Sequence, residues 1–310
     1  MDNIPSFATK GLSWLQISKE SAIALLKSAI RNGWREAVDE FFSGYLHDYV
    51  LDESRAQFSY MLPLERESRV LDLGSNWGAV TLGLARIYKH VIAADITLES
   101  LLFIRERAFQ EGITNIDFVH IDPLEWSPLP FHDLEFDLVV MNGLLEWIGT
   151  SRTDASPSWY QRGALKEVKR VLKRGGGVYI GVENRFAYSY FLGALGHTGI
   201  PYIDLLPRNI ANLLCRSRGF SYGYRNYIYG YFEYKKLLRL CGFRRLVFYI
   251  PWPTYREPKL VIPADQSKTL EYMMVNHVAQ KPTSKALVTV LTKIGLAKYF
   301  VYSYGVYGEA

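Results

Sequence analysis

The chain has 310 residues, enough for one large domain with a substantial core or for one and a half domains of ordinary size. Apolar residues make up 49% and charged residues 22%, which excludes an intrinsically disordered protein. No apolar run approaches the roughly 20 residues that a membrane-spanning helix needs, and the first residues lack the apolar block of a secretory signal peptide. The two cysteines, Cys215 and Cys241, have no metal-ligand spacing, so we expect a cytoplasmic protein without a metal site.

The net charge of +5 hides an uneven distribution along the chain. Residues 1–150 contain 12 Lys and Arg against 22 Asp and Glu, a net charge of −10, whereas residues 151–310 contain 24 against 9, a net charge of +15. An excess of basic residues in one half indicates an anionic partner, such as a phosphate-bearing substrate, a nucleic acid or a lipid surface. General solubility and lysines at helix ends explain the same excess without any partner.

Apolar residues at helical spacing predict a helix over residues 18–49 and a second over 52–62, with Asp52 as its N-cap. From residue 70 onward, short apolar runs alternate with helical patterns. Strands are expected at residues 70–73, 91–96, 116–122, 136–142 and 178–184, and helices at 79–88, 100–112 and 164–177. These strands are too apolar for a sheet with one face in water, so they predict a parallel sheet with helices on both faces.

The alternation stops between residues 185 and 230, a stretch too long for an ordinary loop, so we expect an inserted element there. It resumes with a helix at 231–243 and two strands at 245–253 and 259–263, which would form an antiparallel hairpin at the sheet edge. Residues 268–300 are expected to be helical. The predicted organisation is an N-terminal helical cap (1–65), a sheet domain (66–267) with the insertion (185–230) inside it, and a C-terminal helical extension (268–310).

The first predicted strand leads into a glycine loop, VLDLGSNWG (70–78). A dinucleotide-binding loop needs G-x-G-x-x-G, whose second glycine lets the backbone touch a pyrophosphate. Asn76 occupies that position here; it tolerates a left-handed backbone, but its side chain would crowd a phosphate. Asp72, two residues before Gly74, would repel a phosphate and attract an ammonium or sulfonium group. The loop therefore favours a cationic ligand without phosphate.

Polar residues end the next three predicted strands: Asp95, Asp122 and Asn142. The carboxyl ends of parallel strands lie along one edge of a sheet, where open α/β sheets bind ligands. Asp95 could accept hydrogen bonds from both ribose hydroxyls, Asp122 from an adenine amino group, and Asn142 would reach the middle of the crevice. Each residue alone is also explained as a helix cap or a strand end. With Asp72 they form an ordered set that predicts a site for a zwitterionic nucleoside.

Residues 70–184, with the hairpin at 245–263, resemble a class I S-adenosylmethionine-dependent methyltransferase. VLDLGSNWG matches the family's first motif, usually Asp-x-Gly-x-Gly-x-Gly, except at Asn76, and VIAADIT, HIDPLEW and FDLVVMNGLLEWIG match its second, third and fourth. The resemblance implies a Rossmann-like, mostly parallel seven-stranded sheet with an antiparallel edge hairpin, and S-adenosylmethionine as the cofactor. It also implies the cofactor-binding residues: Asp72, Gly74, Ser75, Asn76 and Gly78 for the methionine part, Asp95 for the ribose, Ile96, Asp122 and Pro123 for the adenine, and Asn142 beside the methionine part.

In this family, the segment after the fifth strand covers the methyl group and forms much of the acceptor pocket. Here that segment, residues 183–208, looks like segments of bacterial methyltransferases of saccharide and surface-polymer pathways. His197 lies between two glycines on an expected bend, and Glu183 ends the fifth strand, so both are candidates for the catalytic base. A histidine in a loop is also commonly a surface residue without a catalytic role.

The insertion further supplies four candidates for binding the acceptor, namely Arg185, Asp204, Arg208 and Tyr224. The run FSYGYRNYIYGYFEY (220–234) could stack on sugar rings, contact lipid headgroups or hold the insertion to the sheet. Trp34, Tyr45 and Tyr49 of the N-terminal helices are expected to cover the cofactor. We therefore expect methyl transfer to an oxygen, less so to a nitrogen, of a small or saccharide-type, phosphate-bearing acceptor. A nucleic acid is not expected as a partner, and peripheral contact with a membrane surface stays open.

Three other functions compete with this interpretation. An NAD(P)-dependent oxidoreductase is disfavoured by Asn76. A non-catalytic scaffold that binds the cofactor and recruits partners is disfavoured by the intact acidic residues at the strand ends. An RNA methyltransferase agrees with the basic half, but the chain has neither the Asn/Asp-Pro-Pro-Tyr motif of base-amino methylases nor a recognisable RNA-binding module.

Overall fold

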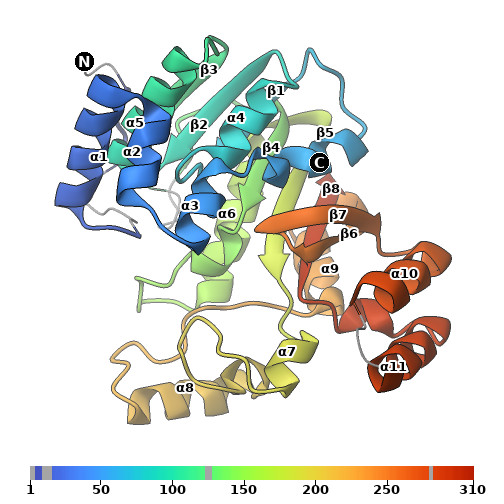
Figure 1. The fold of residues 1–310 in the computed structure, drawn as a ribbon. Coiled ribbons are helices and arrows are strands. Elements are labelled where there is room, and N and C mark those ends of the chain that lie inside the picture. The colour runs from blue at the N-terminus through green and yellow to red at the C-terminus, as the bar shows by residue number, and fades with distance from the viewer. Residues whose placement is uncertain (1–3, 9–15, 123–127, 279–281) are drawn as a thin grey trace.

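In the computed structural model, which describes residues 4–8, 16–122, 128–278 and 282–310, one twisted sheet runs through the molecule (Figure 1). Its strands are β1 (Arg69–Leu73), β2 (His90–Asp95), β3 (Ile116–His120), β4 (Phe136–Asn142), β5 (Leu172–Glu183), β6 (Arg244–Thr254), β7 (Glu257–Pro263) and β8 (Ser303–Glu309), in the order β3-β2-β1-β4-β5-β8-β6-β7. Strands β1 to β5 pair in parallel, β8 is antiparallel to β5 and β6, and β7 is antiparallel to β6. The expected α/β fold, with a mostly parallel sheet and an antiparallel hairpin at its edge, is confirmed.

Helices precede, separate and follow these strands. The N-terminal cap contains α1 (Lys19–Asn32), α2 (Trp34–Phe41), α3 (Tyr45–Leu51) and the 3₁₀-helix η1 (Glu53–Met61). The sheet domain contains α4 (Ala79–Ala85), α5 (Leu98–Gln110), η2 (Leu145–Trp147), α6 (Pro157–Val171) and α9 (Tyr231–Leu240), and the insertion contains α7 (Tyr188–Phe191), η3 (Ile203–Leu205) and α8 (Arg208–Ser217). The C-terminal segment contains α10 (Ser267–Met273), the π-helix η4 (Met274–Val278), α11 (Pro282–Lys293) and η5 (Ala297–Tyr299).

Successive residues of the central strands face opposite sides of the sheet, and both sides are covered. Val70 and Val140 pack with η1 and α4 on one face. Leu71 and Val139 pack with α6 and α9 on the other. Because neither face meets water, the strands are apolar at almost every position, as expected for parallel strands.

The sheet has eight strands and not the seven that were expected. The additional strand, β8, lies at the end of the expected C-terminal helical extension (268–310), beyond the residues 268–300 expected to be helical, and it inserts between β5 and β6. Its glycines weaken the strand pattern of the sequence, but they are required by packing across the sheet. A Cβ atom at Gly305 would lie 2.3 Å from the Tyr179 hydroxyl oxygen, and one at Gly177 of β5 would lie 2.2 Å from the Tyr307 ring. The two tyrosines thus occupy the space that glycine leaves on the neighbouring strand.

The single helix expected over residues 18–49 is three helices, because glycines interrupt it. Gly33, with a φ of 109°, ends α1, and Gly44, with a φ of 55°, lies directly before α3. Glycine adopts such positive φ values more easily than other residues do. The apolar stripe continues across both breaks, so periodicity alone did not reveal them. The expected cap at Asp52 is present, since its side chain accepts a hydrogen bond from the Ser54 amide. Ser18 caps α1 in the same way by accepting one from the Ser21 amide.

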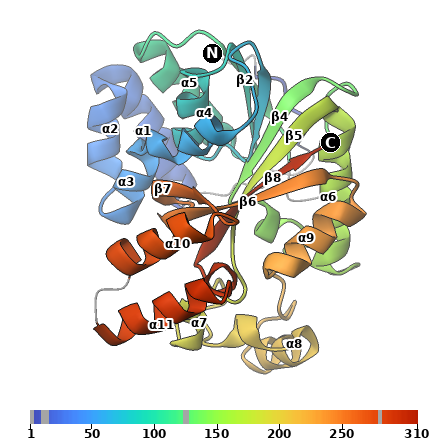
Figure 2. The same ribbon diagram turned by 90° about the vertical axis from the view of Figure 1, so that its right-hand side faces the viewer.

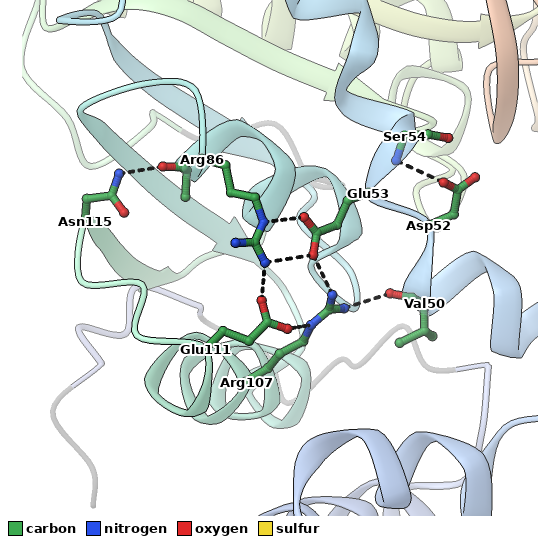
Figure 3. Close-up of polar contacts among 9 residues, drawn as sticks. Val50, Asp52, Glu53, Ser54, Arg86, Arg107, Glu111 and Asn115 are labelled. Carbon is green, nitrogen blue, oxygen red and sulfur yellow. Dashed lines mark hydrogen bonds and ion pairs between the residues drawn. The ribbon is translucent and has the colours of Figure 1, made fainter.

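A group of charged residues around the buried Arg107 fastens the cap to the sheet domain (Figure 3). Arg107 of α5, only 2% exposed, donates to Glu53 of η1 at 2.7 Å, to Glu111 at 2.8 Å and to the Val50 carbonyl at 3.0 Å. Arg86, which follows α4, also contacts Glu53 and Glu111. Each carboxylate therefore bridges two guanidinium groups, an arrangement that pairs every charge in the group.

The insertion forms a separate layer at one end of the molecule, below the sheet in both Figure 1 and Figure 2. The tyrosine-rich run mostly holds this layer in place, since Tyr224, Tyr229, Tyr231 and Tyr234 are buried. Within the described residues, none of the helices has the length and apolar character needed to cross a membrane.

Candidate functional site

A cavity of about 270 Å³ lies at the carboxyl ends of β1, β2 and β4. This is the edge of the sheet at which the sequence predicted a ligand site. The residues that form its wall are Gln16, Tyr45, Leu46, Tyr49, Gly74, Asn76, Asp95, Ile96, Asn142, Gly143, Leu144, Trp147, His197, Tyr255 and Arg256. The cap, three strand ends, the insertion and the β6–β7 turn thus all contribute to one site.

The glycine loop after β1 satisfies its own backbone donors. The amides of Gly74 and Ser75 donate to the Ala94 carbonyl, and the Gly78 amide donates to the Ser75 carbonyl. The Asn76 amide donates to Asp95 Oδ2 at 2.8 Å, and the Trp77 amide donates to Asn76 Oδ1 at 2.8 Å. A pyrophosphate cradle needs amides that point at the ligand, and all five amides of residues 74–78 are engaged within the protein. The loop therefore does not have the donors of a dinucleotide site.

The turn itself depends on three left-handed residues, with φ of 84° at Gly74, 49° at Asn76 and 88° at Gly78. We expect Gly78→Ala to lower the free energy of unfolding by about 1–3 kcal/mol more than Gly112→Ala does, because a Cβ at Gly78 would lie 2.6 Å from Ile104. Gly112 is a matched control, since it also has a positive φ (69°) but open space around it. Urea unfolding of both variants measures the difference, and equal losses would contradict the proposed clash.

Asp95 is the acidic residue that lies in the cavity wall. Its side chain is 6% exposed, and its two oxygens accept the amides of Asn76 and Thr97, both at 2.8 Å. Burial raises the pKa of Asp95, and the two amide bonds oppose that rise. These bonds fix the carboxylate at the mouth of the loop, and each oxygen keeps a lone pair for a hydroxyl donor.

Asp72 lies beneath the loop and not in the cavity wall. Its carboxylate accepts a hydrogen bond from Thr81 Oγ1 at 2.6 Å. Burial raises its pKa to about 6; the Thr81 bond and the charge of Arg55 oppose this rise, and the Asp95 carboxylate adds to it. Asp72 therefore shapes the loop from below, and its expected contact with the methionine part stays a prediction.

A raised pKa in the folded state means that protonated Asp72 favours folding. Its contribution is fully present below the ordinary pKa of 3.8 and is lost as the pH rises through about 6. We expect the unfolding free energy of the parent, relative to that of Asp72→Asn, to fall by about 3 kcal/mol between about pH 4 and pH 7. Urea unfolding of both proteins across this range tests the expectation. Parallel pH profiles would contradict it.

Asn142 carries polar atoms that lack a partner among the described residues. It ends β4, is 9% exposed and lines the cavity, and within the part of the chain that the structure describes neither its Oδ1 nor its Nδ2 has a hydrogen-bond partner. Buried amide groups in folded proteins are almost always paired, so these atoms indicate a polar ligand. Ile96 also lines the cavity, whereas Ser75 and Asp122 are buried beside it and outside its wall. Pro123 lies outside the described residues.

His197 reaches the cavity from the insertion and faces a buried carboxylate. Its Nε2 is 3.4 Å from Glu183 Oε2, and its ring lies 4.7 Å from that of Trp147. Glu183, at the end of β5, is 3% exposed and does not line the cavity. Its Oε1 accepts from Arg256 Nη2 at 2.7 Å, and its Oε2 accepts from the Tyr190 hydroxyl at 2.8 Å. Of the two candidate bases, His197 is thus the one that meets the cavity.

A second buried carboxylate extends this network. Glu146 of η2 is fully buried and accepts a hydrogen bond from the Tyr255 hydroxyl at 3.1 Å, while Arg256 Nε donates to the same hydroxyl at 3.1 Å. Burial raises the pKa of Glu146, and the charge of His197 opposes that rise. Tyr255 and Arg256 form the two-residue turn between β6 and β7, so the edge hairpin places a guanidinium in the cavity wall.

Residues 71–180 match the family model described as a methyltransferase domain. Among the similar solved structures is the YcgJ protein of Bacillus subtilis, at 19% identity; the match covers 83% of this chain and 97% of that chain, with a TM-score of 0.45. Another is a SAM-dependent methyltransferase of Aquifex aeolicus, at 14% identity; the match covers 89% of this chain and 97% of that chain, with a TM-score of 0.46. A phosphoethanolamine N-methyltransferase 2 of Haemonchus contortus, solved with S-adenosylhomocysteine, shares the fold at 13% identity (91% and 58%, TM-score 0.50). No curated protein matches the sequence significantly.

Residues 71–180 of this chain thus contain a methyltransferase domain. The cavity fits the cofactor of that family, because it offers a carboxylate for the ribose at Asp95, an unpaired amide at Asn142 and no free loop amides for a phosphate. The nucleotide-binding alternative with a pyrophosphate is therefore not supported. The assignments of individual residues to parts of the cofactor stay predictions.

The acceptor-binding residues that were predicted for the methyltransferase do not line the cavity. Arg185 donates to the carbonyls of Asp204 and Leu206, and Tyr224 donates to the Asp204 carboxylate at 2.6 Å. Arg208 donates to the Ile228 carbonyl and stacks on Tyr227 at 3.9 Å. Most of the polar groups named here bond within the insertion, and contact of these residues with the acceptor stays a prediction.

The cap residues behave differently from one another. Tyr45 and Tyr49 line the cavity, as expected from their place on an N-terminal helix. Trp34 does not line it, and its ring centroid instead lies 4.0 Å from the guanidinium carbon of Arg107. Sequence reasoning missed Trp147, Tyr255 and Arg256. The last two lie between the strands expected at 245–253 and 259–263, where the sequence gives no signal of a binding site.

Proposed function

We propose that the protein transfers a methyl group to a hydroxyl oxygen of a small, saccharide-type acceptor with an anionic group. The proposal depends chiefly on His197, which places an imidazole in the wall of the cofactor cavity while Glu183 faces its Nε2. When bound, S-adenosylmethionine supplies an electrophilic methyl group on a sulfonium centre. A hydroxyl acceptor must lose its proton during attack, and an imidazole is suited to accept that proton near neutral pH.

In this proposal His197 and Glu183 have different roles. Glu183 is buried, is paired with Arg256 and does not line the cavity, so it is a poor proton acceptor for a substrate. Its charge instead faces His197 Nε2 and orients the ring. The other ring nitrogen, Nδ1, would then face the acceptor. Glu183 is thus a positioning residue, and His197 is the proposed base.

The cavity wall supports an acceptor with flat apolar faces and one negative group. Tyr45, Tyr49, Trp147 and Tyr255 contribute four aromatic rings to it, and Arg256 contributes a guanidinium. Aromatic side chains offer flat apolar faces with polar edges, and arginine pairs well with carboxylate or phosphate. Buried free thiols at Cys215 and Cys241 agree with the expected cytoplasmic location, which stays a prediction.

Incubation of the protein with methyl-labelled S-adenosylmethionine and fractionated extract of the source cell tests the function. We expect label in a small, anionic, saccharide-containing fraction, with the methyl group held in an ether bond. Label in RNA or protein would contradict the proposal. Tight binding of S-adenosylhomocysteine without transfer to any fraction would instead favour the non-catalytic scaffold.

A further inference from the structure

Exposed apolar side chains concentrate in the insertion. Residues 188–222 contain nine large apolar side chains that are exposed to solvent: Tyr188, Phe191, Leu192, Leu195, Tyr202, Ile210, Leu213, Phe220 and Tyr222. Leu192 is 79% exposed and Leu213 is 70% exposed. Soluble monomeric proteins seldom gather so many exposed apolar residues in one region, and such patches commonly mark an interaction surface. We call this set the apolar end of the molecule.

The exposure does not result from poor packing of the insertion. On α8, Ala211 and Cys215 are fully buried and pack with Ile203 and Tyr224, whereas Ile210 and Leu213 face solvent. The α7 region is divided in the same way, since Tyr190 is buried with Ala187 and Ile228. A helix that buries one apolar face in the core and exposes further apolar residues on another face has a second apolar surface that an interaction could bury.

The apolar end continues into the C-terminal segment. The Tyr188 amide donates to the Phe300 carbonyl at 2.8 Å, and the rings of Phe191 and Phe300 lie 6.0 Å apart. Shortly before Phe300 in the chain, Ile294 is 59% exposed and Leu296 is 40% exposed. Both ribbon views place α7, α8 and α11 at the same end of the molecule, away from α1, α2 and α5 (Figures 1 and 2). Two segments distant in sequence therefore contribute to one end.

The charges of this end are almost all positive. Residues 186–222 contain three arginines and a single acidic residue, Asp204. Asp204 is buried and accepts the Tyr224 hydroxyl, so it does not offset the arginines at the surface. Arg216 and Arg218 are exposed at the end of α8. Apolar and aromatic residues beside arginines, without exposed carboxylates, complement a surface that is apolar inside and anionic outside.

From this combination we infer that the apolar end docks on an anionic lipid bilayer. Leu192, Leu195 and Leu213 insert among the acyl chains, and Arg216 and Arg218 lie at the headgroups. His197 belongs to the same segment, between Leu195 and Tyr202, and its side chain lines the cofactor cavity. Docking therefore brings the membrane to the element that closes the active site. The inference does not depend on which acceptor is methylated.

Co-flotation of the full-length protein with vesicles tests the apolar contribution. We expect it to bind vesicles of phosphatidylcholine and phosphatidylglycerol at low salt, and Leu192→Asp with Leu195→Asp to weaken this binding by about tenfold or more. Phe109→Asp is the matched control, because Phe109 is equally exposed (79%) but lies on α5 at the opposite end. It should bind vesicles within twofold of the parent. Unchanged S-adenosylhomocysteine binding confirms that each variant is folded.

The charge contribution needs a second pair of variants. Arg216→Ser with Arg218→Ser should reduce binding to the anionic vesicles by about tenfold and weaken its salt dependence, since each basic residue near such a surface contributes separately. Arg31→Ser with Arg35→Ser, in exposed positions on the cap, should bind as the parent does.

Three results would overturn the inference. The first is that the parent fails to bind the vesicles, or binds neutral vesicles of phosphatidylcholine alone equally well. The second is that the parent is a dimer in light scattering and Leu192→Asp with Leu195→Asp makes it monomeric, which assigns the surface to a second copy of the chain. The third is that the parent binds oligonucleotides and no vesicles, with loss in the Arg216→Ser, Arg218→Ser variant.

Discussion

Replacement of Asp95 by alanine is expected to weaken binding of S-adenosylhomocysteine by about 10²- to 10⁴-fold. The Asp95 carboxylate is held at the cavity by the amides of Asn76 and Thr97, in a position to accept two ribose hydroxyls. A hydrogen bond to a charged group contributes about 1.5–3 kcal/mol, and two such bonds give this loss. Isothermal titration calorimetry of both proteins measures it.

Two further variants make the result specific to the ligand. Asp117→Ala removes an exposed carboxylate from the neighbouring strand β3 and should bind as the parent does. Asp95→Asn keeps one oxygen that can accept the Asn76 or Thr97 amide, so it should lose less affinity than alanine. Affinity of Asp95→Ala within threefold of the parent, in a protein that melts normally, would show that Asp95 does not contact the cofactor.

The His197→Gln variant should transfer methyl groups about 10²- to 10⁴-fold more slowly than the parent, which is the usual contribution of a general base. Its affinity for S-adenosylhomocysteine should be unchanged, because the imidazole is proposed to contact the acceptor and not the cofactor. Single-turnover transfer from labelled cofactor into the active extract fraction measures the rate. A rate within a few-fold of the parent would exclude His197 as the base.

Glu183 and His90 provide the comparisons for this experiment. Glu183→Gln leaves the imidazole in place but removes the charge that faces it, so the loss in rate should be smaller than for His197→Gln. His90→Gln, at the start of β2 and remote from the cavity wall, should leave the rate unchanged. An equal loss of rate in Glu183→Gln and His197→Gln would contradict the separate roles proposed for the two residues and show that they act together.

The cofactor side of the site could be located from the sequence because strand ends are local features. Asp95, Ile96 and Asn142 each follow an apolar run, and parallel pairing alone brings the ends of such runs to one edge. The unusual loop residue Asn76 could also be interpreted, since its left-handed backbone follows from its own chemistry. These inferences require no knowledge of distant contacts.

The acceptor side could not be predicted in the same way. Arg185 and Arg208 have the residue types of anion-binding groups, but two donors of Arg185 and one of Arg208 are bonded to nearby carbonyls. These bonds depend on how the insertion folds back on itself. Arg256 looked like an ordinary turn residue, and it meets the cavity because β8 sets the distance between the hairpin and β5. Such placements arise from tertiary packing, which periodicity and motifs do not describe.

The position of β8 also determines how the two parts of the sheet are joined. β5 and the β6–β7 hairpin have no strand pairing with each other, and both bond to β8, whose residues are translated after all of them. A nascent chain that has already emerged up to the hairpin still carries two unsatisfied strand edges, which are prone to pair with other chains. Residues 303–309 therefore join β5, whose last residue is Glu183, to the hairpin whose turn carries Arg256. A segment that follows all of its partners in the chain thus connects two sides of the cavity.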